Sequence, residues 1–414
     1  SWSLREAIVK AFPKEALLIL DLRGSSTSKA EFWGYPTVVG NLHNFGGRIN
    51  MHGDLALLAS NQYSKAKRLN PAVCGSGLFM EAIEQNPVYY ELAFEMPCHP
   101  DSIDLRAWLK QYATRRYGAF SPATQKAWML LLEGPYRQGT NGTEKSSIVA
   151  ARPALDVKKS GPNAGLEIPY DPALIIRAQS LLLEDADKLS ASRPYRFDLV
   201  DVQRQMMTNL GQLIHRKAAE AFRSKDREAF TLHSGRFLGM LADMDTLLRT
   251  RSEYSFDRWL TEARSWGETE EEKNQMERDA TSLVTIWGAD GDPRIFDYSW
   301  REWAGLINGY YLPRWQKFYT MLQQHLDEGT SYEEAGLPQI YGREAFRAND
   351  FYHTLAEWEL SYVDTYGKAR IPATEGDEVD IVKRLFKKYF KLSQEYYTDS
   401  IKLIKPSRDE RTSA

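Results

Sequence analysis

One glutamate lies at a position where parallel sheets usually have catalytic residues. Glu81 follows the sequence GSGLFM (75–80), which continues a strand predicted at Val73–Gly77 and leads into a helix predicted at Glu81–Glu95. In parallel α/β barrels the C-terminal ends of the strands form the active-site rim, and residues there are more often catalytic than structural. Position alone also fits a favourable charge in the first turn of a helix. We take Glu81 as the first catalytic candidate.

A second loop of the same kind lies upstream. His43 and Asn44 follow the apolar stretch Thr37–Val39 and precede two consecutive glycines, Gly46 and Gly47. Two polar loops at neighbouring strand ends predict one shared pocket, because the carboxyl ends of parallel strands meet at the same edge of a sheet. His43 also fits a hydrogen-bonded structural histidine.

The composition excludes several classes of protein. The 414 residues carry 53 basic and 56 acidic side chains, so the net charge of -3 gives no field suited to a nucleic-acid backbone. No apolar run is long enough to span a membrane. Cys74 and Cys98 are the only cysteines and form no CxxC pair, so we expect two free thiols, no structural metal site and no cofactor.

The first hundred residues alternate short apolar strands with helices, which predicts a parallel sheet covered on both faces. The strands are expected at 17–22, 37–42 and 73–77, with helices at 54–67 and 81–95. Three such units are too few to close an eight-stranded barrel. We therefore expect residues 1–104 to be the C-terminal portion of a (β/α)8 catalytic barrel, with further chain before them.

From residue 105 to 414 the apolar residues recur at three- and four-residue steps, which predicts an all-α domain. Residues 134–163 are rich in Gly, Ser and Pro and are expected to form a long surface loop, and they include the formal glycosylation triplet Asn141–Thr143. The helices are expected at 105–117, 122–132, 171–189, 197–222, 227–250, 255–266, 270–285, 299–325, 343–366 and 377–403.

Six motifs in this order resemble the α-N-acetylglucosaminidases of glycoside hydrolase family 89. They are LHNFGG (42–47), GxG leading to ExIxQN (75–86), YAxRRYG (112–118), YRFDL (195–199), TIWG (285–288) with DY (297–298), and AGL (304–306) with YYxPRW (310–315). The resemblance implies the last strands of a (β/α)8 barrel followed by a large α-helical domain.

The resemblance also assigns roles to residues. Glu81 matches the family's nucleophile, and Trp287, Asp297 and Tyr298 match residues of the helical domain that line the pocket. His43 and Asn44 are implied to contact sugar hydroxyls. The family's acid/base glutamate lies on an earlier barrel strand and matches no part of this sequence, so an N-terminal segment of the same enzyme is expected as a partner.

The implied reaction needs two carboxyl groups. Glycosidic cleavage passes through an oxocarbenium-like state, which requires one acid at the departing oxygen and one carboxylate opposite it. In an α-linked N-acetylglucosaminide the 2-acetamido group is cis to the leaving group and cannot attack from behind. The expected enzyme is therefore a retaining exo-glycosidase that removes terminal non-reducing α-linked N-acetylglucosamine from glycans by double displacement.

One alternative from another class stays open, namely a noncatalytic carbohydrate-binding or assembly module. A partner polypeptide carrying the missing glutamate would distinguish the two. The family implies an extracytoplasmic location, whether periplasmic, secreted or lysosomal, and the sequence does not choose among these.

Overall fold

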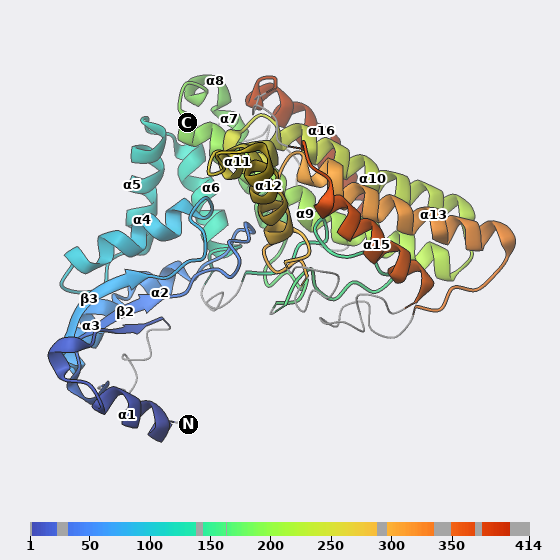
Figure 1. The fold of residues 1–414 in the computed structure, drawn as a ribbon. Coiled ribbons are helices and arrows are strands. Elements are labelled where there is room, and N and C mark those ends of the chain that lie inside the picture. The colour runs from blue at the N-terminus through green and yellow to red at the C-terminus, as the bar shows by residue number, and fades with distance from the viewer. Residues whose placement is uncertain are drawn as a thin grey trace, which may run out of the picture.

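The computed structural model describes residues 2–22, 32–137, 144–162, 164–287, 296–334, 349–368 and 375–397. A small sheet with its helices occupies one end of the molecule, and a large group of helices occupies the other (Figure 1). The glycosylation triplet 141–143, the segments 343–348 and 398–403 of two predicted helices, and the C-terminal tail lie outside these residues.

The sheet has three parallel strands, as the sequence predicts, and their order is β1-β2-β3. They are β1 (Ile19–Asp21), β2 (Thr37–Asn41) and β3 (Val73–Leu78). Val39 and Val73 pack with Ala66 in a small apolar cluster that fixes the sheet against its helix. The loops that follow β2 and β3 leave the sheet at the same edge, which is where both candidate loops begin.

The helices of this part are α1 (Trp2–Lys10), α2 (Leu55–Ala59), α3 (Gln62–Leu69) and α4 (Pro87–Glu95). The single helix predicted at 54–67 was wrong, because Asn61 adopts a left-handed conformation and separates α2 from α3. Its side-chain amide donates to the carbonyls of Met96, His99 and Asp101, so tertiary contacts hold the break.

The predicted helix start at Glu81 was also wrong. Asn86 has a φ of 46° and α4 begins only at Pro87, so Glu81 lies in a loop. The Asn86 side chain accepts from the amide of His52 at 3.0 Å and donates to the carbonyl of Asn50 at 3.1 Å. These bonds tie the loop after β3 to the loop after β2, which local sequence patterns do not reveal.

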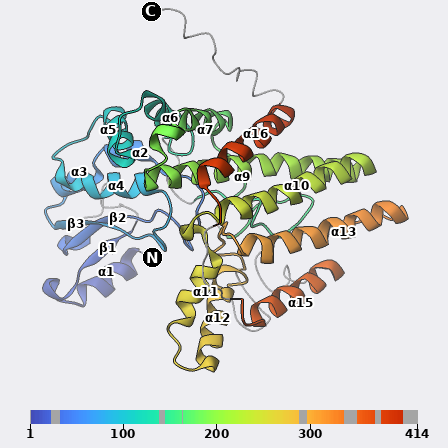
Figure 2. The ribbon, with the colours of Figure 1, turned by 90° about the horizontal axis from the view of Figure 1, so that it is seen from above.

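The remaining described part, from Leu105 onward, is helical with irregular connections. Figure 2 shows α9 and α10 lying side by side as its long axis, with α16 across α9 and α13 beside α10. The helices are α5 (Leu105–Tyr117), α6 (Pro122–Glu133), α7 (Ala173–Glu184), α8 (Ala186–Leu189), α9 (Arg193–Arg223), α10 (Arg227–Leu248), α11 (Phe256–Arg264), α12 (Glu270–Val284), α13 (Leu312–Glu328), α15 (Asp350–Asp364) and α16 (Glu378–Tyr396).

The long helix predicted at 299–325 is shorter in the structure. Trp300 and Trp303 precede it in a non-helical segment, and a π-helical turn at Ile307–Tyr311 opens into α13. One carboxyl oxygen of Asp245 on α10 accepts the amides of Gly305 at 2.7 Å and Asn308 at 3.2 Å. The contacts with Asp245 on α10 therefore set where this helix begins. Residues 296–303 stay outside the helix and can approach the sheet.

The segment predicted as a surface loop at 134–163 is irregular where the structure describes it, but its middle part is not at the surface. Its residues 146–154 are buried, and the carbonyls of Val149 and Ala150 accept from the side chains of Trp315 and Arg314. Buried backbone groups need partners, and side chains supply them here. This segment fills the space between the helices and the loops that leave the sheet.

Within the described residues, no helix is long and apolar enough to cross a membrane. The same part of the chain contains no group of three His, Cys, Asp or Glu side chains that could hold a metal ion. Cys74 and Cys98 are both free and exposed.

Candidate active site

Glu81 lies exposed in the loop that leaves the C-terminal end of β3. Its carboxylate accepts two different donors. The amide of Gly46 donates to Oε2, and the hydroxyl of Tyr298 donates to Oε2 at 2.9 Å and to Oε1 at 3.1 Å. Charge-assisted hydrogen bonds to a carboxylate are stronger than hydrogen bonds between neutral groups, so these two donors fix its orientation. Oε1 is the less engaged of the two oxygens.

The aromatic side of the site comes from the helical part of the chain. Tyr298 is half-buried and its ring lies 4.6 Å from the ring of Trp287, at an angle of 51°. Burial, reinforced by Glu81, raises the pKa of Tyr298 to about 12, so its hydroxyl remains a donor. Trp287 has a φ of 64°, which is unusual for so large a side chain and is found where surrounding contacts enforce it.

Two glycines allow the loop after β2 to reach Glu81. Gly46 has a φ of 62°, and a Cβ atom there would lie 2.6 Å from the carbonyl oxygen of Tyr298. At Gly47, with a φ of 70°, a Cβ atom would lie 2.2 Å from the guanidinium of Arg301. Both positions therefore require glycine, for backbone conformation and for space.

A buried ion pair fastens this loop to Tyr298. Arg48 donates through Nε to the carbonyl of Tyr298 at 2.7 Å and through Nη1 to Glu144 at 2.6 Å. The other carboxyl oxygen of Glu144 accepts the amide of Phe45 at 3.3 Å. The side chains of Arg48 and Glu144 are 1% and 0% exposed. The pair therefore holds both donors of the Glu81 carboxylate in place.

His43 and Asn44 lie beneath the loops and away from solvent. His43 donates from Nε2 to the carbonyl of His52 at 3.1 Å, so its Nδ1 is left to accept from the hydroxyl of Tyr90 at 2.9 Å. Burial lowers the pKa of His43, which keeps the ring neutral. Asn44 donates to the same hydroxyl at 2.9 Å and to the carbonyl of Ala82 at 3.0 Å. Asn44 supports the residue next to Glu81 from behind, and His43 holds the hydroxyl of Tyr90 that Asn44 also contacts.

Asp297 is also buried, directly before Tyr298. Nη1 of Arg314 contacts both of its carboxyl oxygens, at 3.1 and 2.9 Å. Burial raises the pKa of Asp297 to about 7, although the guanidinium of Arg314 opposes that shift. Asp297 has a φ of 55°, and its amide donates to the carbonyl of Thr285 at 2.7 Å. It shapes the turn that presents Tyr298.

Of the residues predicted from sequence, the structure thus brings Glu81, Tyr298 and Trp287 into contact with one another. His43, Asn44 and Asp297 lie in the layer that supports them, and their contact with a sugar stays a prediction.

Comparisons with known proteins bear on this arrangement. Residues 2–100 match the model of the α-N-acetylglucosaminidase (NAGLU) tim-barrel domain, and residues 108–388 match the model of the α-N-acetylglucosaminidase (NAGLU) C-terminal domain. The chain belongs to the α-N-acetylglucosaminidase family, glycoside hydrolase family 89. The resemblance inferred from the six motifs is confirmed.

A human family member, α-N-acetylglucosaminidase, is 33% identical over 397 residues, which are 93% of this chain and 50% of that protein. The chain therefore spans about half the length of this curated relative. A family 89 glycoside hydrolase from Clostridium perfringens in complex with PUGNAc superposes with a TM-score of 0.80 at 27% identity, covering 93% of this chain and 42% of that one. A variant with two glutamates changed to glutamine, in complex with its substrate GlcNAc-α-1,4-galactose, gives the same score and identity, covering 91% and 42%.

Sequence reasoning missed the ion pair that organises this family 89 site. Arg48 directly follows the two glycines, which is a usable signal for a positioning role. Glu144 lies 96 residues further on in an irregular segment, and nothing local marks it as a partner. The role of Gly46 as a backbone donor was missed for the same reason.

Proposed function

We propose that this chain is the C-terminal part of a retaining exo-glycosidase that hydrolyses terminal non-reducing α-linked N-acetylglucosamine, with Glu81 as the nucleophile. The observation that carries this is the exposed Glu81 carboxylate at the edge of the sheet, held by donors from Gly46 and Tyr298. The substrate complex of the Clostridium perfringens relative, with two glutamates replaced, supports a mechanism that uses two carboxyl groups.

In the first step Oε1 of Glu81 forms a bond to the anomeric carbon while the bond to the departing oxygen breaks. That oxygen takes its proton from the general acid, a glutamate that we assign to the N-terminal segment of the same enzyme. In the second step the same glutamate removes a proton from water, which attacks the anomeric carbon and releases Glu81 as a carboxylate. Two inversions return the α-anomer, and they require carboxyl groups about 5 to 5.5 Å apart.

The supporting residues have separate tasks in this scheme. Tyr298 and the amide of Gly46 orient the carboxylate of Glu81, and Trp287 offers an aromatic wall to the sugar. His43 and Asn44 hold the loop of Glu81 from behind, and Asp297 holds the turn of Tyr298. We treat these three as positioning residues.

We further propose that residues 1–104 complete a (β/α)8 barrel with the N-terminal segment, and that 105–414 form the helical domain. An apolar surface supports the need for that segment, since leucines on and beside β1 and apolar side chains of α1 are about half exposed. They are Leu4, Ile8, Phe12, Leu18, Leu20 and Leu22, at 42–60% exposure. We propose that the whole enzyme acts outside the cytoplasm, as the family resemblance implies, and that its partner is a glycan with terminal α-linked N-acetylglucosamine.

The test is hydrolysis of an aryl α-N-acetylglucosaminide by the polypeptide that includes the N-terminal segment, followed by proton NMR from the first turnovers. We expect the α-anomer of N-acetylglucosamine to appear first and the β-anomer only by mutarotation. Initial release of the β-anomer would overturn double displacement. Sugar binding without hydrolysis would instead favour the noncatalytic module.

Replacing Tyr298 with phenylalanine should reduce kcat by roughly 10²-fold, the scale seen when one donor to a reacting oxygen is removed. The ring contacts with Trp287 and Arg48 remain in this variant, so the fold should be unaffected. KM should change little, which a purely structural defect would not predict. Tyr63→Phe is the matched control, because within the described residues its hydroxyl accepts one hydrogen bond, from the exposed Lys67 at 3.4 Å. An unchanged kcat would remove the hydroxyl from the mechanism.

A further inference from the structure

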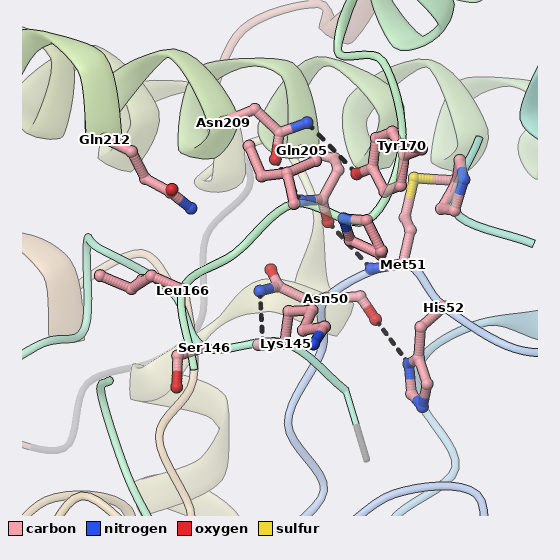
Figure 3. Close-up of a pocket in the computed structure, with 13 residues that line it drawn as sticks. Asn50, Met51, His52, Lys145, Ser146, Leu166, Tyr170, Gln205, Asn209 and Gln212 are labelled. Carbon is pink, nitrogen blue, oxygen red and sulfur yellow. Dashed lines mark hydrogen bonds between the residues drawn. The ribbon is translucent and has the colours of Figure 1, made fainter. Parts of the chain in front are cut away.

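A cavity of about 210 Å³, which Glu81 does not line, is bordered by residues 50–52 and by α9 (Figure 3). Five stretches of the chain line it: residues 50–52 after β2, Pro135, residues 145 and 146, residues 166–170, and one face of α9. The described lining residues are Asn50, Met51, His52, Pro135, Lys145, Ser146, Leu166, Ile168, Pro169, Tyr170, Gln205, Asn209 and Gln212.

The back wall of this cavity is rigid. Gln205 accepts the amide of Met51 at 2.9 Å and donates to Asn209 at 3.0 Å, and Asn209 donates to the hydroxyl of Tyr170 at 3.2 Å (Figure 3). Gln205 and Asn209 are each 3% exposed. A chain of buried side-chain hydrogen bonds fixes rotamers, so the wall does not reorganise when a ligand enters.

The same wall is anchored by charge. Arg204 donates to Asn50 at 3.2 Å and to the carbonyl of Ile49 at 2.9 Å, and it pairs with Asp201 at 2.8 Å and also with Glu302. These bonds hold residues 49–52 against α9. The cavity is therefore preformed.

Three polar groups at the cavity are left for a ligand. Within the described parts of the chain, the Lys145 ammonium and the Gln212 amide make no hydrogen bond or ion pair, and both side chains are partly exposed. Tyr170 accepts from Asn209, which leaves its own proton to donate. These groups are mainly donors. No aspartate or glutamate is among the described lining residues.

We propose that this cavity is a second glycan-binding site that takes a sugar unit carrying a carboxylate or a sulfate ester. A positive, donor-rich mouth suits an anionic oxygen group. Five apolar side chains complete the lining and suit the C–H faces of a sugar ring: Met51, Pro135, Leu166, Ile168 and Pro169. The choice of a sugar rests on the proposed function. The charge of the ligand rests on Lys145.

The test measures binding by titration calorimetry and saturation-transfer NMR with three matched ligands: methyl α-D-glucuronide, glucose 6-sulfate and the neutral methyl α-D-glucoside. We expect at least one anionic sugar to bind at least ten-fold more tightly than the glucoside. Lys145→Met should remove that advantage, and Gln212→Leu should weaken anionic binding several-fold. Lys217→Met on α9 is the matched control, since its ammonium is exposed and paired with Glu220.

Equal affinity for charged and neutral sugars, no binding of any of them, or undiminished binding by Lys145→Met would each overturn the proposal. Unchanged thermal unfolding midpoints show that the variants are folded. Binding is read without turnover and Glu81 does not line the cavity. A failure here therefore leaves the proposed hydrolysis standing, and an inactive enzyme leaves this site standing.

Discussion

Replacing Glu81 with glutamine is expected to lower kcat for an aryl α-N-acetylglucosaminide by a factor on the order of 10⁴ or more, the scale at which loss of a nucleophile acts. Glutamine has nearly the same shape and keeps one oxygen to accept from Tyr298 and Gly46. It cannot form the ester with the anomeric carbon. The measurement is steady-state hydrolysis by the polypeptide that also carries the general acid.

Glu84→Gln is the matched control for this experiment. Glu84 lies three residues further along the same loop, is half exposed, and its nearest cation is Arg258 at 3.7 Å. This substitution should leave kcat within about two-fold, because surface charge pairs contribute little. The Glu81→Gln variant should still bind the substrate with the affinity of the unchanged protein. Full activity in Glu81→Gln would remove Glu81 from the reaction.

Arg48→Met is expected to have the largest effect on stability, about 3–5 kcal/mol in the free energy of unfolding, because it leaves Glu144 buried without its partner. The same substitution removes the hydrogen bond to the carbonyl of Tyr298. Hydrolysis should therefore fall even where the variant is still folded. Urea unfolding followed by circular dichroism gives the free energy.

Two comparisons separate the buried pair from a general loss of charge. Arg115→Met breaks a pair with Glu91 in which the side chains are 46% and 43% exposed, and should cost no more than about 1 kcal/mol. Adding Glu144→Gln to Arg48→Met should recover part of the lost stability, because the buried charge is gone. If Arg48→Met lowered the free energy of unfolding by no more than Arg115→Met does, the pair of Arg48 and Glu144 would not hold the site together.

Several helices were predictable because their ends are marked locally. α5 begins after Asp104, whose side chain accepts two backbone amides, and α12 begins with a capping box between Thr269 and Glu272. The sequence predicts both starts at the observed residues. The errors fall where tertiary contacts decide, at Asn61 and Asn86, whose left-handed conformations are stabilised by partners far along the chain.

The residues of the candidate site also fall into those that the sequence indicated and those that only the structure reveals. Position at a strand end indicated Glu81, and the family resemblance indicated Tyr298 and Trp287. The buried clamp of Arg48 and Glu144 could not be inferred, because neither spacing nor periodicity connects an arginine to a glutamate in a distant irregular segment. The burial of residues 146–154 could not be predicted from local patterns. Two of their carbonyls accept hydrogen bonds from side chains of α13, whereas a helix or strand would satisfy them with backbone amides.

The two donors to Glu81 come from opposite directions along the chain, since Gly46 lies 35 residues before it and Tyr298 lies 217 residues after it. During translation the glutamate is thus made long before its tyrosine. A premature stop codon anywhere between them would leave a polypeptide that retains Glu81, the proposed nucleophile, but lacks Tyr298. On the proposed function, we expect the products of such alleles to show no glycan hydrolysis.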